Sequence, residues 1–361
     1  MPRRLPLYQQ AQSVQFAKLD KPHAGLWFEK FFSDFESGYH EKQKQPQMYK
    51  DIINPKAQPD KSTLEAYYKR HTQLISAQKG QTKLFKNQWH FVTGMGQEHP
   101  IENGFSFHPL LGCPYLSGST LKGLLRHWIK FYQKDPKTLL DWFGSEDDKN
   151  PQAGSLIFFD ALPIAQPKLI VDIMTPHYGD WYLNGGNGTL APDDAQEPTP
   201  ISFLVIESNT PFAISIASRK PEEAANKDIT KAFEELAQAL ELLGAGAKTA
   251  TGYGRFKEDK EATENLHKKQ QKQAAEAAKS PFIKKLEQLH KNYIEQGKQP
   301  GSAAAQPLKT FITDAIENQL EKLKQAECQA LKTVANDYKP SKKQEKAYKA
   351  LKQKLNEKLT T

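Results

Sequence analysis

The sequence predicts an α+β fold with a ferredoxin-like (RRM-like) βαββαβ core. Two amphipathic helical segments alternate with short β-branched and aromatic segments between residues 87 and 256. Their order is strand, helix, strands, helix, strand, which is typical of an antiparallel sheet with two helices on one face. We therefore predict an RRM-like core at 87–256, an extension packed on it at 1–86, and a helical, basic C-terminal extension at 257–361.

The N-terminal extension is polar and carries scattered aromatic residues and prolines. Its clearest element is STLEAYYKRHTQLISAQKG, which predicts a helix that begins at Ser62 or Thr63 and ends at Gly80. The segment lacks an apolar core of its own, so we expect it to pack on residues 87–256 and not to fold alone.

The core begins with NQWHFVTG (87–94), a predicted first strand. STLKGLLRHWIKFY (119–132) predicts the first helix, because its large apolar residues recur at helical spacing. SLIFFDA and KLIVDIM predict two further strands. ISFLVIE and PFAISIA predict a hairpin that turns at Ser208-Asn209.

The end of the core is a second helix followed by a strand. DITKAFEELAQALELLG (228–244) predicts the helix, and Gly244 stands where its C-terminal cap belongs. ATGYGRF predicts the last strand. The segment 174–200, rich in glycine, proline and aromatic residues, is too long for a plain turn, so we predict a functional insertion.

The C-terminal extension is helical in composition. SPFIKKLEQLHKNYIEQG predicts a helix that begins after Ser280 and ends at Gly297. A second apolar stripe follows, and both stripes require burial against the extension itself or against a partner. The second stripe consists of Leu308, Phe311, Ile312, Ile316, Leu320 and Leu323.

The formal net charge is +8, and a basic balance favours an acidic partner, most commonly nucleic acid. Residues 257–361 contain 22 of the 50 basic residues and 14 of the 42 acidic ones, so 1–256 contain 28 of each. A nucleic-acid site in the core must therefore use a few local donors. The sequence shows no signal peptide and no run of about 18 apolar residues, so we expect a cytoplasmic protein that contacts no membrane.

The stretch HPLLGCPYLSGSTLKGLLR, from His108 to Arg126, is the first candidate binding motif. Its hydroxyl residues crowd the start of the predicted helix, where unpaired N–H groups attract anions. Lys122 and Arg126 add positive charge, and the glycines permit close approach of another backbone. An ordinary capped amphipathic helix would explain the same pattern.

The stretch GAGAKTATGYGRF, from Gly244 to Phe256, is the second candidate motif. Its glycines permit positive φ and can expose a concave set of N–H groups. Lys248 and Arg255 could contact phosphate, and Tyr253 could stack on a base. The alternative is a helix C-cap followed by a tight turn into a strand.

Together these motifs resemble those of the RAMP superfamily of CRISPR proteins. GMGQEHPIENGFSFHPLLGCPYLSGSTLKGLLR is similar to the first signature of the superfamily, and GAGAKTATGYGRF resembles its glycine-rich loop. GSLIFFDALP, DIMTPHYGDWY and PTPISFLVIE are similar to subunits of the type III-B (Cmr) effector complex. The resemblance covers roughly 87–256.

The resemblance implies a non-catalytic subunit that binds the 3′ part of the guide RNA (crRNA) and caps the filament of backbone subunits in antiviral defence. Its implied partners are guide RNA, target RNA and the other RAMP subunits of the complex, namely the backbone, 3′-end and small subunits. The segment 174–200 would form a thumb across the guide–target duplex. The implied RNA-binding residues are Ser117, Gly118, Ser119, Lys122, Arg126, His177, Tyr178, Gly246, Lys248, Thr249, Thr251, Tyr253 and Arg255.

An alternative within the superfamily is a metal-independent endoribonuclease that processes guide precursors. Histidines are frequent, and His127 or His177 could act as a general base. We expect His127 to be partly buried beside the apolar stripe of its helix. Cys113 and Cys328 lie far apart and in no ligand spacing, so we predict no metal site and no cofactor.

Overall fold

The computed structural model describes residues 16, 19–20, 22–32, 47–147, 149–183, 191, 198, 200–300 and 302–360. The chain divides into two compact units, Met1–Glu264 and Asn265–Thr361. Each unit has a hydrophobic core of its own. No described helix has the length and apolar character needed to cross a bilayer.

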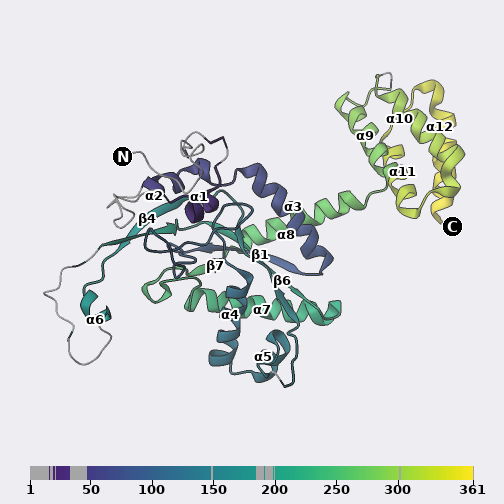
Figure 1. The fold of residues 1–361 in the computed structure, drawn as a ribbon. Coiled ribbons are helices and arrows are strands. Elements are labelled where there is room, and N and C mark those ends of the chain that lie inside the picture. Colours follow the sequence, from purple (N-terminus) through teal and green to yellow (C-terminus); the bar gives the residue numbers. More distant parts are fainter. Residues whose placement is uncertain are drawn as a thin grey trace. The chain divides into compact units, whose positions relative to one another are not determined.

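The first unit is built on an antiparallel sheet (Figure 1). Its main strands are β1 (Gln81–Asn87), β2 (Leu156–Phe158), β6 (Pro211–Ser218) and β7 (Phe256–Glu258), in the order β2-β6-β1-β7. In the long β1–β6 ladder, Gln81 lies opposite Ile216 and Lys86 opposite Pro211. The short β3 (Leu162–Pro163) also pairs with β6.

Two helices pack against one face of this sheet, as Figure 1 shows. α4 (Gly118–Trp128) follows β1, and α7 (Glu222–Leu242) follows β6. Leu121 of α4, Phe233 of α7 and Phe85 of β1 are fully buried in one core. The Trp128 Nε1–H donates to Glu235 Oε2 at 2.7 Å, which joins the two helices at their polar edge. The predicted α+β class with an antiparallel sheet is confirmed.

α4 does not end at a conventional cap. It continues into a π-helical turn, η5 (Ile129–Gln133), and then α5 (Pro136–Phe143) begins after Asp135. The Asp135 carboxylate accepts the Thr138 N–H at 3.1 Å, and Pro136 occupies the first helical turn.

The opposite face of the sheet is covered by α3 (Lys61–Ala77). Ile214 and Ile216 of β6 belong to the core with α4 and α7, so Ser215 between them points to the other face. There it bonds His71 Nε2 of α3 at 3.1 Å. The cap of α3 is Asp60, which accepts the Thr63 N–H at 2.7 Å, and the helix begins at Lys61, so the predicted start at Ser62 or Thr63 is one or two residues late.

A separate two-stranded sheet is formed by β4 (Leu169–Met174) and β5 (Ile201–Ile206). The connection between them contains α6 (Gly179–Leu183). Residues 184–190, 192–197 and 199, which complete the predicted insertion, lie outside the described residues. The Tyr49 hydroxyl of α2 (Gln47–Ile52) donates to the Ser202 carbonyl at 2.7 Å, and α1 (Ala24–Lys30) adds Trp27 and Phe28 to the core. The short η4 (Pro55–Ala57) links α2 to α3.

The predicted hairpin of ISFLVIE with PFAISIA is wrong. β5 pairs with β4, whereas β6 pairs with β1, β2 and β3. The buried Asn87 side chain explains the divergence, because its Nδ2–H₂ donates to the Glu207 carbonyl at 2.9 Å and its Oδ1 accepts the Thr210 N–H at 2.8 Å. Asn209 adopts a φ of +62°, and the chain passes from one sheet to the other around Asn87.

Two strand predictions are also misplaced. NQWHFVTG contributes only Asn87 to a strand, because the sheet begins with the more polar QTKLFKN, and Phe91 makes an isolated bridge to Ile206. ATGYGRF contributes only Phe256 to β7, since the preceding residues form a short 3₁₀ turn, η6 (Thr249–Thr251), and a loop. Both stretches resemble strands because they contain buried or half-buried apolar and aromatic residues, Phe91 and Val92 in the first and Tyr253 and Phe256 in the second.

The second unit is helical. It contains most of α8 (Lys260–Ala278), then α9 (Pro281–Glu295), α10 (Ala305–Asp314), α11 (Gln325–Asp337) and α12 (Glu345–Thr360). Between α10 and α11 lie η7 (Ala315–Gln319) and η8 (Leu320–Lys322), and η9 (Lys342–Gln344) precedes α12. Ser280 caps α9 and Gly297 follows its end with a φ of +74°, as predicted.

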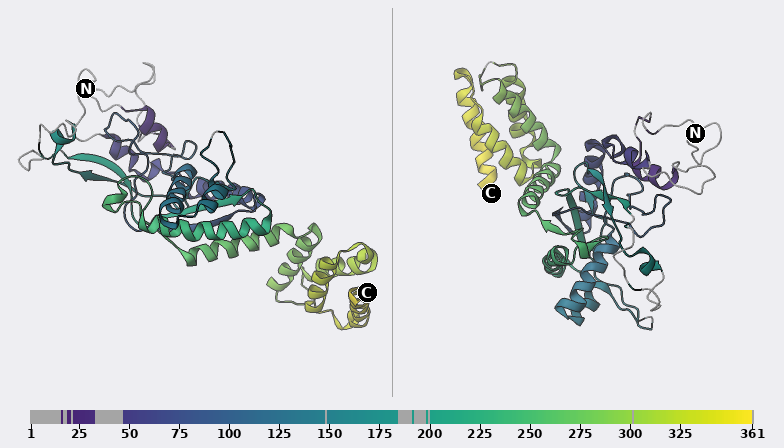
Figure 2. Two further views of the ribbon diagram at one scale, coloured as in Figure 1. Left: turned by 90° about the horizontal axis from the view of Figure 1, so that it is seen from below. Right: turned by 90° about the vertical axis from the view of Figure 1, so that its left-hand side faces the viewer.

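Helices α9 to α12 of the second unit, drawn in light green to yellow, gather into one bundle in both views of Figure 2. The predicted apolar stripes close on each other there, since Leu286, Leu308 and Ile312 are fully buried in the core of this unit. Of the two ways to bury the stripes, the extension therefore uses its own helices.

The separate cores predict two unfolding transitions for the whole chain. We expect a chain truncated after Ala278 to keep the transition of the first unit unchanged, because the first turn of α8 remains. Thr263 Oγ1 of that turn accepts the Leu84 N–H at 3.0 Å, and the Asp259 N–H donates to the Leu84 carbonyl at 2.9 Å. Truncation after Glu258 should therefore lower the melting temperature of the first unit. Differential scanning calorimetry would contradict this division if the whole chain showed one transition that both truncations abolished.

Candidate nucleic-acid interface

The glycine loop, residues 244–256, adopts backbone angles that favour glycine. Gly244, Gly246, Gly252 and Gly254 have φ of +77°, +87°, +96° and +67°. Lys248 is also left-handed, with a φ of +57°. Gly244 follows the last residues of α7, where the sequence predicts a cap. A loop with this many left-handed positions turns too tightly for the predicted strand to begin before Phe256.

Two of these glycines allow backbone segments to touch. A Cβ on Gly246 would lie 2.1 Å from the Val92 carbonyl oxygen, and one on Gly254 would lie 1.9 Å from the Ala245 carbonyl oxygen. Two hydrogen bonds join the loop to the preceding segment: the Ala247 N–H donates to Val92 O at 2.9 Å, and the Gly254 N–H donates to His90 O at 2.9 Å. The loop is therefore fixed against residues 90–92.

Other N–H groups of the loop remain available. Those of Gly246, Lys248, Thr249 and Ala250 have no hydrogen-bond partner within the described part of the chain. These residues are exposed or half-exposed, and the last three are consecutive at the left-handed turn. Successive N–H groups in such a turn form a concave anion-binding nest.

The side chains of the loop differ in what they contact. Lys248 Nζ lies 3.4 Å from Met174 Sδ and 5.3 Å from the centre of the Phe203 ring, with no carboxylate partner among the described residues. Arg255 donates to the Glu241 and Thr249 carbonyls at 3.4 and 3.3 Å, which places its charge at the C-terminal end of α7. Lys248 is thus the cation of this loop with no internal counter-charge.

The remaining predicted side chains of the loop, Thr251 and Tyr253, bond within the protein. Thr251 Oγ1 donates to the Lys248 carbonyl at 2.9 Å. The Tyr253 hydroxyl donates to Asp172 Oδ2 of β4 at 2.6 Å, and burial together with this bond raises the pKa of Tyr253 to about 12. Its ring centre lies 6.0 Å from that of Phe203. Tyr253 therefore fastens the loop to the β4–β5 sheet, and base stacking by this residue stays a prediction.

The start of α4 is capped by one of the predicted hydroxyl residues. Ser117 is the N-cap, and its Oγ accepts the Thr120 N–H at 3.2 Å. The Ser119 hydroxyl lies 2.9 Å from that of Ser117. The Gly118 N–H donates to Asp160 Oδ1 at 2.7 Å, so a carboxylate of the protein already occupies part of the predicted anion position. A Cβ on Gly118 would lie 2.5 Å from the Phe158 carbonyl oxygen, which explains the glycine.

The two basic residues of α4 have different surroundings. Arg126 forms an ion pair with Glu146 in the acidic run after α5. Lys122 is half-exposed and makes no ion pair or hydrogen bond to any described residue. Lys122 is therefore the better placed of the two to bind a phosphate.

Residues 90–93 connect the two motifs. Their backbone bonds the glycine loop through His90 and Val92, and the Thr93 hydroxyl donates to the Tyr115 carbonyl at 3.0 Å, two residues before Ser117. His177 and Tyr178, the implied RNA-binding residues of the predicted insertion, lie beyond the end of β4 and just before α6. His177 is exposed and Tyr178 half-exposed.

Trp89 is a surface residue that the sequence did not single out. Its side chain is 54% exposed, and its ring centre lies 4.4 Å from that of His90. His90 in turn lies 6.4 Å from the ring of Tyr253. The sequence placed Trp89 in a strand, where a large aromatic residue is ordinary, so only its exposure beside the glycine loop marks it as a base-stacking candidate.

A cluster of titratable groups lies near the start of α4. Burial lowers the pKa of His71 and His108, and the negative charge of Asp160 only partly opposes this decrease. Burial and the charge of Asp160 both raise the pKa of Tyr67. His108 Nδ1 accepts the Leu110 and Leu111 N–H groups, both at 3.3 Å, and His71 bonds Ser215. These bonds give both histidines structural roles.

The described residues contain no group of three or more His, Cys, Asp or Glu side chains that could hold a metal ion. His127 is exposed, which corrects the expected partial burial, and its ring centre lies 4.6 Å from that of Phe131. Neither His127 nor His177 has a carboxylate partner in the portion of the chain that the structure describes.

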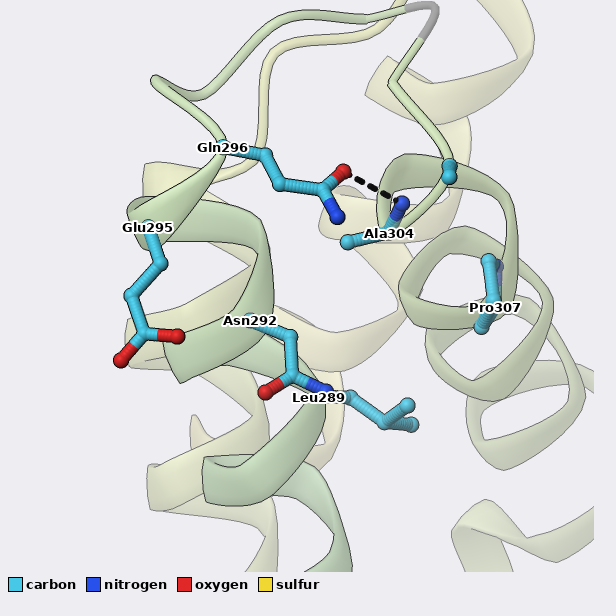
Figure 3. Close-up of a pocket in the computed structure, with 7 residues that line it drawn as sticks. Leu289, Asn292, Glu295, Gln296, Ala304 and Pro307 are labelled. Atoms are coloured by element: carbon cyan, nitrogen blue, oxygen red, sulfur yellow. Dashed lines mark hydrogen bonds between the residues drawn. The ribbon is translucent and has the colours of Figure 1, made fainter.

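A pocket in the second unit lies between the end of α9 and the start of α10 (Figure 3). Its polar lining includes Asn292, Glu295 and Gln296, and Gln296 Oε1 accepts the Ala304 N–H at 2.9 Å. With one carboxylate among its lining residues, it offers no acid–base pair. It belongs to the helical unit and contains none of the predicted RNA-binding residues.

The core of the first unit is matched by a sequence model of the RAMP superfamily over residues 85–257, from β1 to β7. The protein "CRISPR system Cmr subunit Cmr6" of Pyrococcus furiosus is 30% identical over 250 residues, 53% of this chain and 72% of that protein. The chain belongs to the Cmr6 family of the RAMP superfamily. A Cmr6 relative from Saccharolobus solfataricus is 28% identical over 160 residues, 43% of this chain and 49% of that protein.

Among solved structures, a chain of the type III-B Cmr-beta complex bound to cognate target RNA aligns with a TM-score of 0.47 and 23% identity. The alignment covers 59% of this chain and 70% of that one. The glycine loop, α4 and Trp89 all lie within the residues that the RAMP model matches, so the candidate interface belongs to the shared core.

The contacts of Gly246 predict that alanine destabilises the protein more at this position than at Gly252. Alanine at Gly246 or at Gly252 should cost about 1–2 kcal/mol from the left-handed φ alone. A Cβ at Gly252 meets nothing within 4 Å, whereas one at Gly246 meets Val92, so Gly246→Ala should cost roughly a further 1–3 kcal/mol. Urea denaturation of both variants measures the difference. Equal destabilisation would show that the loop does not depend on close approach to Val92.

Proposed function

We propose that this Cmr6-family chain is a non-catalytic RNA-binding subunit of a type III-B CRISPR effector complex. It contacts the 3′ part of the guide RNA and caps the filament of backbone subunits, next to target RNA, the 3′-end subunit and the small subunit, in the cytoplasm and in antiviral defence. In such complexes base pairing reads the sequence, while the protein binds backbone and shape.

The observation that carries this proposal is the nest of the glycine loop. Three consecutive N–H groups, from Lys248 to Ala250, and the Lys248 ammonium have no internal counterpart in the described residues. N–H donors and a lysine bind phosphate irrespective of base identity. Lys122 at the start of α4 supplies a second charge of the same kind. Because the first unit is close to neutral overall, such local groups must provide its RNA affinity.

The fold gives the nest a fixed support. The chain order β1, α4, β2, β6, α7, β7 and the strand order β7-β1-β6-β2 support a ferredoxin-like core, with β4 and β5 inserted between β2 and β6. We assign the β4–β5 sheet and α6 to the thumb. Tyr253 joins this sheet to the glycine loop through Asp172, so guide binding at the loop and duplex contact by the thumb are mechanically linked.

Two substitutions separate the contribution of charge to RNA binding from the contribution of base stacking. Lys248→Ala should lower the slope of log affinity against log salt by about 0.7 for single-stranded RNA. Trp89→Ala should cost roughly 1–3 kcal/mol of RNA binding at every salt concentration and leave the slope unchanged. Fluorescence anisotropy with labelled single-stranded RNA measures both quantities.

Phe131→Ala is the matched control for Trp89, because Phe131 is 55% exposed and lies in η5. It should bind RNA like the wild type. If Lys248→Ala and Trp89→Ala both fold and also bind like the wild type, the glycine loop is only a turn, and the proposed function loses its site.

The alternative function is guide-precursor processing by a metal-independent endoribonuclease. We expect the purified chain to cleave no repeat-containing RNA in EDTA, because His127 and His177 lack an orienting carboxylate in the described residues. Gel analysis of wild type, His127→Ala and His177→Ala tests this expectation. Cleavage by the wild type that either substitution abolishes would establish the alternative and refute a non-catalytic role.

A further inference from the structure

The second unit carries the excess positive charge of the protein. Residues 265–361 contain 20 lysines, no arginine and 10 acidic residues, whereas residues 1–264 contain 30 basic and 32 acidic residues. The charge is concentrated further within the unit. The stretch 338–356 contains seven lysines and one acidic residue, Glu345.

These lysines form a stripe on α12 and on the turn before it. Lys342, Lys346 and Lys349 follow each other at i, i+4 and i+7, which places them on one side of the helix. All three are exposed. Tyr348 and Leu355 mark the opposite side and are buried in the core of the unit.

Four of the ten acidic residues of the unit pair, at 2.7 Å or less, with lysines outside the stretch 338–356. Lys279 pairs with Glu276 and Glu287 at 2.7 and 2.6 Å, Lys298 pairs with Asp337 at 2.6 Å, and Lys358 pairs with Glu321 at 2.7 Å. Lys342, Lys346, Lys349 and Lys354 make no ion pair with any residue that the structure describes. Like charges this close repel one another, so an external anion would stabilise the stripe.

The apolar side of α12 is already covered. Leu355 is fully buried, and the Tyr348 hydroxyl donates to the Ala335 carbonyl at 3.2 Å. Insertion into a membrane or into a hydrophobic groove would require these side chains to leave their core. The exposed side offers charge, which suits a polyanion and not insertion among lipid acyl chains or binding of an apolar peptide.

We propose that Lys342, Lys346 and Lys349, together with the exposed Lys354 further round the helix, bind the phosphate backbone of RNA; these four lysines are termed the α12 stripe. The inference rests on the proposed function in one respect, namely that RNA is the polyanion that the chain meets. The stripe has no arginine, so it lacks bidentate and stacking donors and binds RNA without reading its sequence. It thereby gives the chain a second RNA-binding surface, outside residues 85–257 that the superfamily shares.

The test uses the whole chain with all four stripe lysines changed to glutamine. The control changes four exposed lysines of α8 and α9, namely Lys268, Lys269, Lys272 and Lys284, and so removes the same charge. The probe is a labelled polyuridine of about 30 nucleotides, titrated between about 50 and 200 mM salt. For each phosphate that the stripe variant no longer binds, the slope of log affinity against log salt should fall by about 0.7, and the control should change it by less than about 0.7 in total.

Three results would overturn the inference: an unchanged slope for the stripe variant, an equal decrease for both variants, or weaker binding to phosphatidylserine vesicles with unchanged RNA affinity. Melting temperatures of both variants confirm that the unit remains folded. Lys248→Ala and Trp89→Ala in the same titration separate the two proposals. If these two variants weaken RNA binding and the stripe variant does not, the inference fails and the proposed function stands. If only the stripe variant weakens RNA binding, the glycine loop is not the binding site, and the inference about the stripe stands.

Discussion

The close approach of the glycine loop to residues 90–92 is the constraint on which the candidate interface depends. Neither the Gly246 nor the Gly254 position has room for a side chain, because each faces a backbone carbonyl. The hydrogen bonds of Ala247 and Gly254 then hold the loop at a fixed distance from residues 90–92. The N–H groups of residues 248–250 remain unpaired within the described chain as a consequence of this fixed turn. The nest is thus a product of packing, with glycine as its enabling residue.

The basic residues of the two candidate motifs differ in their partners within the protein. Arg126 and Arg255 have internal acceptors, Glu146 and the end of α7, whereas Lys122 and Lys248 have none in the described residues. Arginines with internal acceptors stabilise the fold, and lysines without them remain available to a ligand. The number of basic residues in a motif therefore overstates the charge that it can offer to RNA.

The two units differ in how they present positive charge. The first unit contains the residues that the superfamily shares, and in the proposed function a few placed donors provide its affinity for RNA. The second has its own apolar core and a large excess of lysine. Its apolar stripes close on one another, which removes the main reason to expect a hydrophobic protein partner for them. What remains on its surface is charge.

The sequence by itself determined the α+β class, both core helices, the caps at Ser280 and Gly244, a hydroxyl cap for α4, and the glycine loop as a left-handed turn. These features depend on local spacing and backbone preference, which neighbouring residues encode. Tertiary structure alone decided the strand partners of β5 and β6, because the buried Asn87 redirects the chain through contacts more than 100 residues apart. It also decided that Tyr253 bonds Asp172, that Asp160 occupies the start of α4, and that Trp89 is exposed, since burial and partners depend on segments that the fold brings together.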